Sequence, residues 1–229
     1  MIRGDLAMLA DTVRMTEEIT TLTDRLHVLL NVAGGVRDRM IITSEGNEAT
    51  FAGNHLGHFL LTKKLMPTLR ATAAGSERGA VRVVSVSSTG HERCPGINWA
   101  DLQQTKDWVS GKNYCLAKLC NILFTRELAK RAGGDGIVAH AMHPGEVASN
   151  FASHAVPEMK AYMETLDAMS PEVPAETLVW LASAPEVGKT TGGYFHNFAQ
   201  QVPAPAALDD AAAARLWDES ERLLDRAGH

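Results

Sequence analysis

The sequence predicts an α/β fold in which helices cover both faces of a parallel sheet. Two observations lead to this prediction: short apolar runs end in glycine or small polar residues, and longer helical patterns separate these runs. Strands that are buried on both faces read as near-continuous apolar runs. The chain has 229 residues, of which 45% are hydrophobic, so we expect one domain over residues 1–229 with a substantial core.

Four runs are expected to be strands, and they cover residues 26–30, 81–87, 137–142 and, more weakly, 193–196. In open α/β sheets, ligands bind beyond the carboxyl ends of the strands. Here the first three runs are followed by residues suited to that task, namely 31–35, Ser87-Ser88 and Pro144-Gly145. Each could also be ordinary turn chemistry, but three in succession predict a cleft.

Helices are expected between and after these strands, at residues 8–24, 45–70, 112–131, 175–184 and 209–226. In the third of them, apolar residues from Leu116 to Leu128 recur at the i, i+3, i+4, i+7 spacing of one buried face. Gly133-Gly134 is expected to end that helix. Residues 202–207 are expected to form a surface connection to the last helix.

Composition argues against several classes of protein. The 22 basic and 27 acidic residues give a net charge of −5, so neither nucleic acid nor an anionic membrane is an expected partner. No apolar run approaches the roughly 18 residues that span a bilayer, and residues 1–13 lack a secretory signal. Three cysteines, Cys94, Cys115 and Cys120, are too few for a disulfide framework or a zinc site. We therefore expect a cytoplasmic protein without a bound metal.

The most specific chemical feature is the pair Tyr114 and Lys118. At i and i+4 of a helix, the two side chains project from the same face. An ammonium near a phenol favours the phenolate and lowers a pKa that is ordinarily about 10. Tyr114 would then exchange a proton near neutral pH, with the hydroxyl of Ser88 available to bind a substrate oxygen. Asn54 is expected in mid-helix, where asparagine is a mediocre helix former, and could equally be an exposed polar position.

These residues belong to a longer set of segments that resembles the short-chain dehydrogenase/reductases, and in particular the retinol-dehydrogenase-like branch. The matching segments are residues 29–34, 54–62, 83–88, 101–103, 114–128 and 143–145. The wide interval between Ser88 and Tyr114 is typical of that branch. The resemblance extends from about Asp5 to Phe151 and implies a Rossmann-like, doubly wound parallel sheet.

The resemblance also implies a role for each matching residue. Tyr114 corresponds to the proton donor and acceptor, Lys118 to the residue that lowers its pKa and holds the nicotinamide ribose, and Ser88, rather than Ser87, to the hydroxyl that orients the substrate. Asn54 corresponds to the asparagine that supports a water-linked proton relay to the lysine. The implied contacts to the cofactor are made by Asp5, Asn31, Ala33, Gly34, Tyr114, Lys118, Pro144, Gly145, Val147 and Ser149.

The chain departs from the family pattern at three places. Val32 stands where asparagine is usual, and Ser149 where threonine is usual. The third departure is larger, because no glycine-rich turn that would bind a pyrophosphate precedes Asn31. Residues 1–3 resemble the end of the family's third strand, so about two βα units, roughly 60 residues, are expected to be missing. Strand 26–30 would then be an apolar edge. Two explanations are possible: the sequence is a fragment or has a misassigned start, or another element or subunit covers this edge. We favour the first.

Three functions follow from these observations. The first is reversible hydride transfer between a nicotinamide and an apolar alcohol, aldehyde or ketone. The cofactor is NAD or NADP, which the sequence does not distinguish. The second is a non-catalytic relative that has lost the dinucleotide site, and the third is redox-neutral acid–base chemistry by Tyr114.

An apolar stripe from Met159 to Leu166 could contact the substrate or the core. Because helices 45–70 and 112–131 resemble the usual subunit interface of the family, a homo-oligomer is expected.

Overall fold

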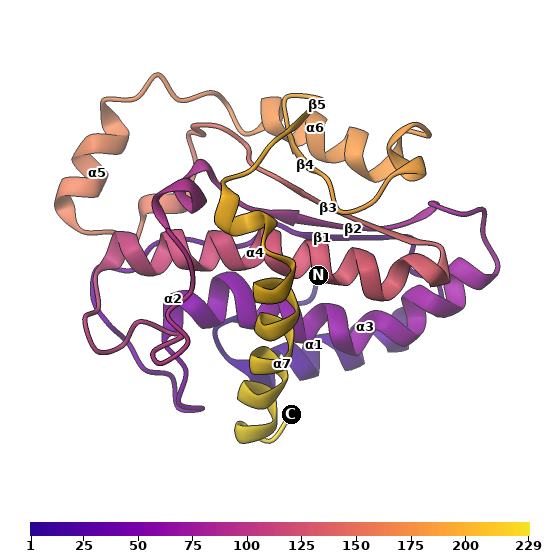
Figure 1. Ribbon diagram of the computed structural model, residues 1–229, viewed down its shortest axis with the longest axis horizontal. Helices are drawn as coiled ribbons and strands as arrows, with labels where there is room; N and C mark the ends of the chain where they lie inside the picture. Colours follow the sequence, from indigo (N-terminus) through magenta and orange to yellow (C-terminus); the bar gives the residue numbers. More distant parts are fainter.

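Five strands form one sheet in the order β1-β2-β3-β4-β5 in the computed structural model, which describes residues 1–229 (Figure 1). β1 to β4 run parallel to one another, and β5 pairs antiparallel with β4. The strands are β1 (Val28–Asn31), β2 (Val81–Val86), β3 (Ile137–Met142), β4 (Tyr194–His196) and β5 (Ala199–Gln201). All residues of β2 and β3 are buried, as their continuous apolar runs predict.

Helices lie on both faces of the sheet. α1, α3, α4 and α7 lie on one face and α6 on the other, while α5 stands away from the sheet (Figure 1). The α-helices are α1 (Leu9–Leu22), α2 (Ala49–Phe51), α3 (Gly57–Ala74), α4 (Ser110–Ala132), α5 (Pro157–Glu164), α6 (Glu172–Ser183) and α7 (Asp210–Arg226). The predicted α/β fold with a mainly parallel sheet covered on both faces is confirmed. None of the helices combines the length and the apolar character needed to cross a membrane.

Two apolar clusters hold the helices to the sheet. The larger contains 30 buried residues and joins the sheet to α3, α4 and α7, with Phe59, Leu119 and Leu123 among its most buried side chains. The smaller, of six residues, lies on the other face, where Leu181 of α6 packs against Val84 of β2. The periodic apolar stripe that the sequence shows on α4 is therefore the contact of that helix with the sheet.

The C-terminal helix α7 covers the outer surface that α3 and α4 form together. Trp217 packs edge-on against Phe59 at 4.9 Å between ring centroids and stacks against Phe124 at 5.9 Å. The Oγ of Ser220 lies 3.0 Å from the Nε2 of the buried His55. These are the helices at which the sequence predicts a subunit interface. α7 thus packs on part of that surface within the same chain, and the homo-oligomer stays a prediction.

The strands differ from their predicted bounds in ways that local hydrogen bonds explain. The first strand begins at Val28 instead of residue 26, because the N–H of Leu26 donates to the Oγ1 of Thr72 instead of to a neighbouring strand. All residues of β5 are exposed, so no apolar pattern in the sequence predicts this strand. Residues 1–3, expected to end a strand, form no strand.

Two helix predictions are also corrected. The helix predicted to start at residue 45 starts at Ala49, because the carboxylate of Glu45 accepts hydrogen bonds from the N–H groups of Leu9 and Ala10 and so caps α1. α4 does end before Gly133, but Gly133 keeps a right-handed conformation at φ −62°. Gly136, at φ +80°, supplies the left-handed conformation that turns the chain into β3.

Candidate active site

Ser88 and Tyr114 lie together beyond the end of β2. Ser88 precedes a 3-10 helix at Thr89–Arg93, and its Oγ accepts a hydrogen bond of 3.0 Å from the N–H of Gly90. The side chain of Ser88 is near enough to Tyr114 to lower the pKa of the phenol in part. A Cβ on Gly90 would lie 3.3 Å from the ring of Tyr114 and 3.4 Å from the Oγ of Ser88. The turn thus brings the hydroxyl and the phenol into contact.

The neighbouring Ser87 has a different environment. It is 1% exposed, and its Oγ donates a 2.7 Å hydrogen bond to the backbone carbonyl of Lys118. This contact joins the end of β2 to α4. The hydroxyl of Ser87 is therefore bound to a backbone carbonyl and not to the phenol of Tyr114. Of the two serines, Ser88 is therefore the one that can reach a substrate oxygen beside the phenol.

Lys118 is buried one helical turn from Tyr114. Its Nζ lies 5.6 Å from the centroid of the Tyr114 ring and donates a 3.1 Å hydrogen bond to the carbonyl of Val86. Burial lowers the pKa of Lys118 to about 8, so the side chain remains mainly cationic at neutral pH. The helix spacing places the ammonium and the phenol on the same side, as predicted.

The predicted lowering of the pKa of Tyr114 is not found in this structure. Burial instead raises the pKa of Tyr114 to about 12, and the nearby side chain of Ser88 opposes that rise only in part. The physical reason is that the phenol is removed from water, which penalises the phenolate. In addition, the ammonium of Lys118 is directed to a backbone carbonyl.

Phe151 is the residue that covers Tyr114. It lies in a 3-10 helix at Asn150–Ala152, and the two rings meet edge to face at 5.0 Å between centroids. Its backbone carbonyl also lies against Gly35 on the far side of the site, where a Cβ would be only 3.2 Å away. The segment after β3 therefore closes over the phenol, and the sequence pattern gave no indication of this contact.

Asn54 lies where a π-helical turn, Ala52–Leu56, leads into α3. Its amide Nδ2 donates to the carbonyls of Gly35 and Thr50 at 2.9 and 2.8 Å, and its Oδ1 accepts from the N–H of Gly35 at 3.1 Å. The carbonyl of Asn54 itself accepts a 3.1 Å hydrogen bond from Nδ1 of His58. Asn54 is thus buried and fixes the loop after β1, and it is not the exposed polar residue that was the alternative.

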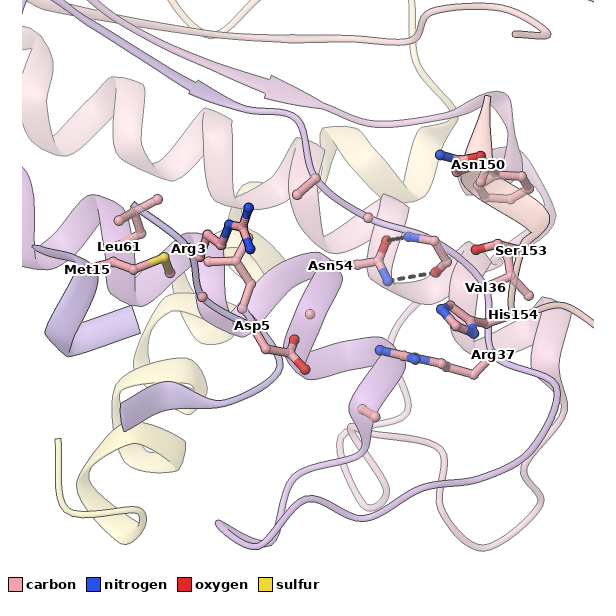
Figure 2. A pocket seen from close by; sticks show the side chains of 18 of the residues that line it. Arg3, Asp5, Met15, Val36, Arg37, Asn54, Leu61, Asn150, Ser153 and His154 are labelled. Atoms are coloured by element: carbon pink, nitrogen blue, oxygen red, sulfur yellow. Dashed lines mark hydrogen bonds between the residues drawn. The ribbon is translucent and has the colours of Figure 1, made fainter. Parts of the chain in front are cut away.

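An open cleft of about 630 Å³ runs past this loop (Figure 2). Four of the predicted site residues line it: Asp5, Ala33, Gly34 and Asn54. Arg3, Arg37 and His154, which the sequence analysis did not single out, line it as well, and Figure 2 shows Arg37 and His154 close together beside Asn54. Phe151 also lines the cleft, whereas Tyr114 and Lys118 do not. Phe151 thus contacts both the open cleft and the ring of Tyr114.

The remaining predicted residues lie outside the lining of the cleft. Asn31 is buried, and its Nδ2 donates to the Oγ1 of Thr62 at 3.0 Å. Gly145 has a φ of +82° and lies close to the side chain of Met169, while Val147 pairs with Met169 in an isolated bridge. Ser149 caps the 3-10 helix that carries Phe151, and Pro144 is half-buried. The segment 144–149 thus sets the position of Phe151.

α5 follows this segment and carries the apolar stripe that begins at Met159. None of its residues is buried, and Tyr162 is 53% exposed. The stripe is therefore not a core contact, which was one of the two interpretations of the sequence. It is an apolar surface near the covering segment, and Figure 1 shows α5 projecting from the body of the protein.

Phe151→Ala tests whether Phe151 sets the environment of Tyr114. Removing the ring should expose the phenol, so we expect the pKa of Tyr114 to fall from about 12 towards 10. Absorbance titration of tyrosinate measures this, with Tyr114→Phe identifying the signal among the three tyrosines. The pKa of Tyr114 is higher in the folded protein than in the unfolded chain. The contribution of Tyr114 to the free energy of unfolding is therefore complete below pH 10 and is lost as the pH rises through about 12.

Phe198→Ala is the matched control, because Phe198 is 44% exposed and contacts Trp180 on the other side of the sheet. It should leave the Tyr114 titration unchanged. If Phe151→Ala also leaves the titration unchanged, Phe151 is not the group that buries the phenol.

Comparison with known proteins shows the family of the chain. The family model described as short chain dehydrogenase matches residues 1–160. Human retinol dehydrogenase 13 is 35% identical over an alignment that covers 96% of this chain and 67% of that protein. This chain thus spans about two thirds of the length of that relative.

Two solved structures share the fold. An uncharacterised protein from Mycobacterium paratuberculosis has a TM-score of 0.70 at 28% identity, covering 97% of this chain and 74% of that one. The 3-ketoacyl-(acyl-carrier-protein) reductase from Brucella melitensis, solved with NADH, has a TM-score of 0.63 at 19% identity, covering 85% and 75%. The segments around Ser88, Asn54, Tyr114 and Lys118 lie within the residues that the family model matches. On this basis, the chain is a member of the short-chain dehydrogenase family.

Proposed function

We propose that this chain takes part in reversible hydride transfer between a nicotinamide cofactor, NAD or NADP, and an apolar alcohol, aldehyde or ketone. The observation that carries the proposal is the cluster of Ser88, Tyr114 and Lys118 at the end of β2 and on the adjacent helix α4. Family membership and the resemblance to retinol dehydrogenase 13 support the same reaction class.

The residues around the cleft fit the nicotinamide ribose end of a dinucleotide. A Cβ on Gly34 would overlap the Oδ1 of Asn54 and lie 3.2 Å from the Nζ of Lys118, so only a glycine lets the backbone come this close to the ammonium. A ribose placed against Ala33 and Gly34 would therefore be within reach of Lys118. Asp5 lines the other part of the same cleft. When bound, the cofactor supplies or accepts the hydride.

The side chains of this protein would handle the proton and the orientation of the substrate. The Oγ of Ser88 accepts from the N–H of Gly90, which leaves its own hydroxyl proton free to bind a carbonyl oxygen. Tyr114 would donate its proton to that oxygen in the reduction and accept one in the oxidation. Lys118 would hold the ribose beside this loop, since its Nζ lies 3.2 Å from the position of a Cβ on Gly34, and Asn54 holds the loop of Gly34 and Gly35 in place.

Phe151 packs against the ring of Tyr114 and also lines the open cleft, so it would lie beside a substrate bound at the phenol. The segment that carries it continues into α5, whose apolar side is uncovered. A substrate with an apolar body could contact Phe151 and the α5 stripe while its carbonyl reaches Ser88. This arrangement supports an apolar substrate, as the name of the human relative also suggests.

Binding and turnover test the proposal together. In titration calorimetry with NADH and with NADPH, at least one dinucleotide should bind saturably, and the chain should then reduce an apolar aldehyde or oxidise retinol. If neither dinucleotide binds, the proposal is wrong.

The comparisons lend no support to the non-catalytic alternative. The predicted cytoplasmic location and the homo-oligomer stay predictions.

A further inference from the structure

His91 is a fully buried histidine beside Ser88 that the proposed mechanism does not use. It lies in the 3-10 helix at Thr89–Arg93 and is 0% exposed. Its Nδ1 lies 2.6 Å from the carbonyl oxygen of Ser88, and its Nε2 lies 3.0 Å from the backbone nitrogen of Ala204. Both ring nitrogens therefore have one partner each, on segments that are far apart in the sequence.

The chemistry of these two partners fixes the state of the ring. A backbone carbonyl only accepts a hydrogen bond, so the Nδ1 of His91 carries a proton. A backbone N–H only donates, so the Nε2 offers its lone pair to Ala204. The ring is thus neutral with its proton on Nδ1, and a second proton on Nε2 would break the bond to Ala204.

This histidine acts on the residue that carries the proposed substrate contact. The carbonyl of Ser88 accepts from both the ring Nδ1 and the backbone N–H of His91, and the Oγ of Ser88 accepts from Gly90. These bonds fix the backbone of Ser88 and leave its hydroxyl proton free for another acceptor. On its other side, the His91 ring packs edge-on against Tyr194 at 5.2 Å between centroids, so it cannot rotate freely.

We propose that His91 is a positioning residue that holds the Ser88 hydroxyl at the angle needed to bind the substrate oxygen. The inference rests on the proposed function, since it assigns His91 a role in the same reaction. The bond from Ala204 fixes the ring, and the bond to Ser88 transmits that position to the active site. Residues 202–207, predicted as a plain surface connection, thereby help to fix the serine.

Two substitutions separate the two hydrogen bonds. In His91→Asn, the amide Nδ2 takes the place of Nδ1 and can still donate to Ser88. In His91→Gln, the amide lies one bond further out, near Ala204, so the Ser88 bond is lost. We expect His91→Gln to lower kcat on the order of 10²-fold, the cost of a small misplacement of a catalytic group, with KM and dinucleotide Kd unchanged.

His91→Asn is the conservative variant, and it should restore most of the wild-type kcat. His27→Gln, on an exposed histidine before β1, is the matched control and should have no effect. An equal loss of kcat in the Asn and Gln variants, or full activity in the Gln variant, would overturn the inference. So would a loss confined to dinucleotide binding.

A second measurement does not depend on activity. Nitrogen-15 NMR of the histidine rings should show His91 as the neutral Nδ1-protonated tautomer, assigned by its disappearance in His91→Asn. An Nε2-protonated ring would contradict the inference. If the wild-type protein reduces no carbonyl, the proposed function fails, while the tautomer still tests the geometry of His91.

Discussion

Tyr114→Phe should abolish carbonyl reduction while leaving dinucleotide binding intact. The substitution removes only the hydroxyl that donates the proton, and general acid catalysis contributes on the order of 10²–10⁴-fold to kcat. The ring keeps its contact with Phe151, so the fold and the cleft should be unchanged. Steady-state kinetics with the preferred dinucleotide measures kcat, and calorimetry measures the binding.

Tyr162→Phe is the matched control, because Tyr162 lies on α5 and is 53% exposed. It removes the same hydroxyl from a position without a hydrogen-bonding partner in the active site, and kcat should stay at the wild-type value. Should Tyr114→Phe retain wild-type kcat, the phenol is not the proton donor and the roles given to Ser88 and Lys118 lose their basis.

Gly34→Ala should weaken dinucleotide binding and lower activity together. The new Cβ would overlap the Oδ1 of Asn54 and lie 3.2 Å from the Nζ of Lys118. Asn54 would have to give up its hydrogen bonds to Gly35, so the loop and the ammonium would shift. A displacement of about 1 Å near a reacting group costs on the order of 10²-fold in rate, and we expect a loss of this size in kcat/KM.

Gly111→Ala provides the control for this substitution. Gly111 lies in the first turn of α4, and nothing lies within 4 Å of the position its Cβ would take. This variant should bind the dinucleotide as the wild type does and should be equally or slightly more stable, since alanine favours the helix. Wild-type dinucleotide binding by Gly34→Ala would show that the cofactor does not approach this loop.

The regular elements of this protein were largely predictable from local patterns. β3 has the predicted bounds, Ile137–Met142. Its residues form a short, mainly apolar run, which is the pattern of a strand buried on both faces of a sheet. α4 was predicted within two residues at each end, because its apolar stripe has the period of a helix. β5 was missed because all its residues are exposed, so no apolar pattern marks it.

The relative positions of Tyr114, Lys118 and Ser88 were predictable but their electrostatics were not, and the functional roles of the site residues stay predictions. The spacing of Tyr114 and Lys118 correctly places both side chains on one helix face, and Ser88 does lie beside Tyr114. The predicted low pKa of Tyr114 is not found in this structure, because the phenol is buried, with Phe151 packed against its ring, and Val86 accepts the hydrogen bond of Lys118. Both partners come from segments distant in sequence, and a helix spacing carries no information about them.

The sequence by itself determined which segments become strands and helices and which polar residues gather at the ends of the strands. Those properties follow from the period of the apolar residues along the chain. Only the tertiary structure decided that α7 covers α3 and α4, that Phe151 closes over Tyr114, and that His91 joins Ser88 to Ala204. Burial and hydrogen bonding at these places depend on which distant segments meet, and a pKa follows from that environment and not from the residue alone.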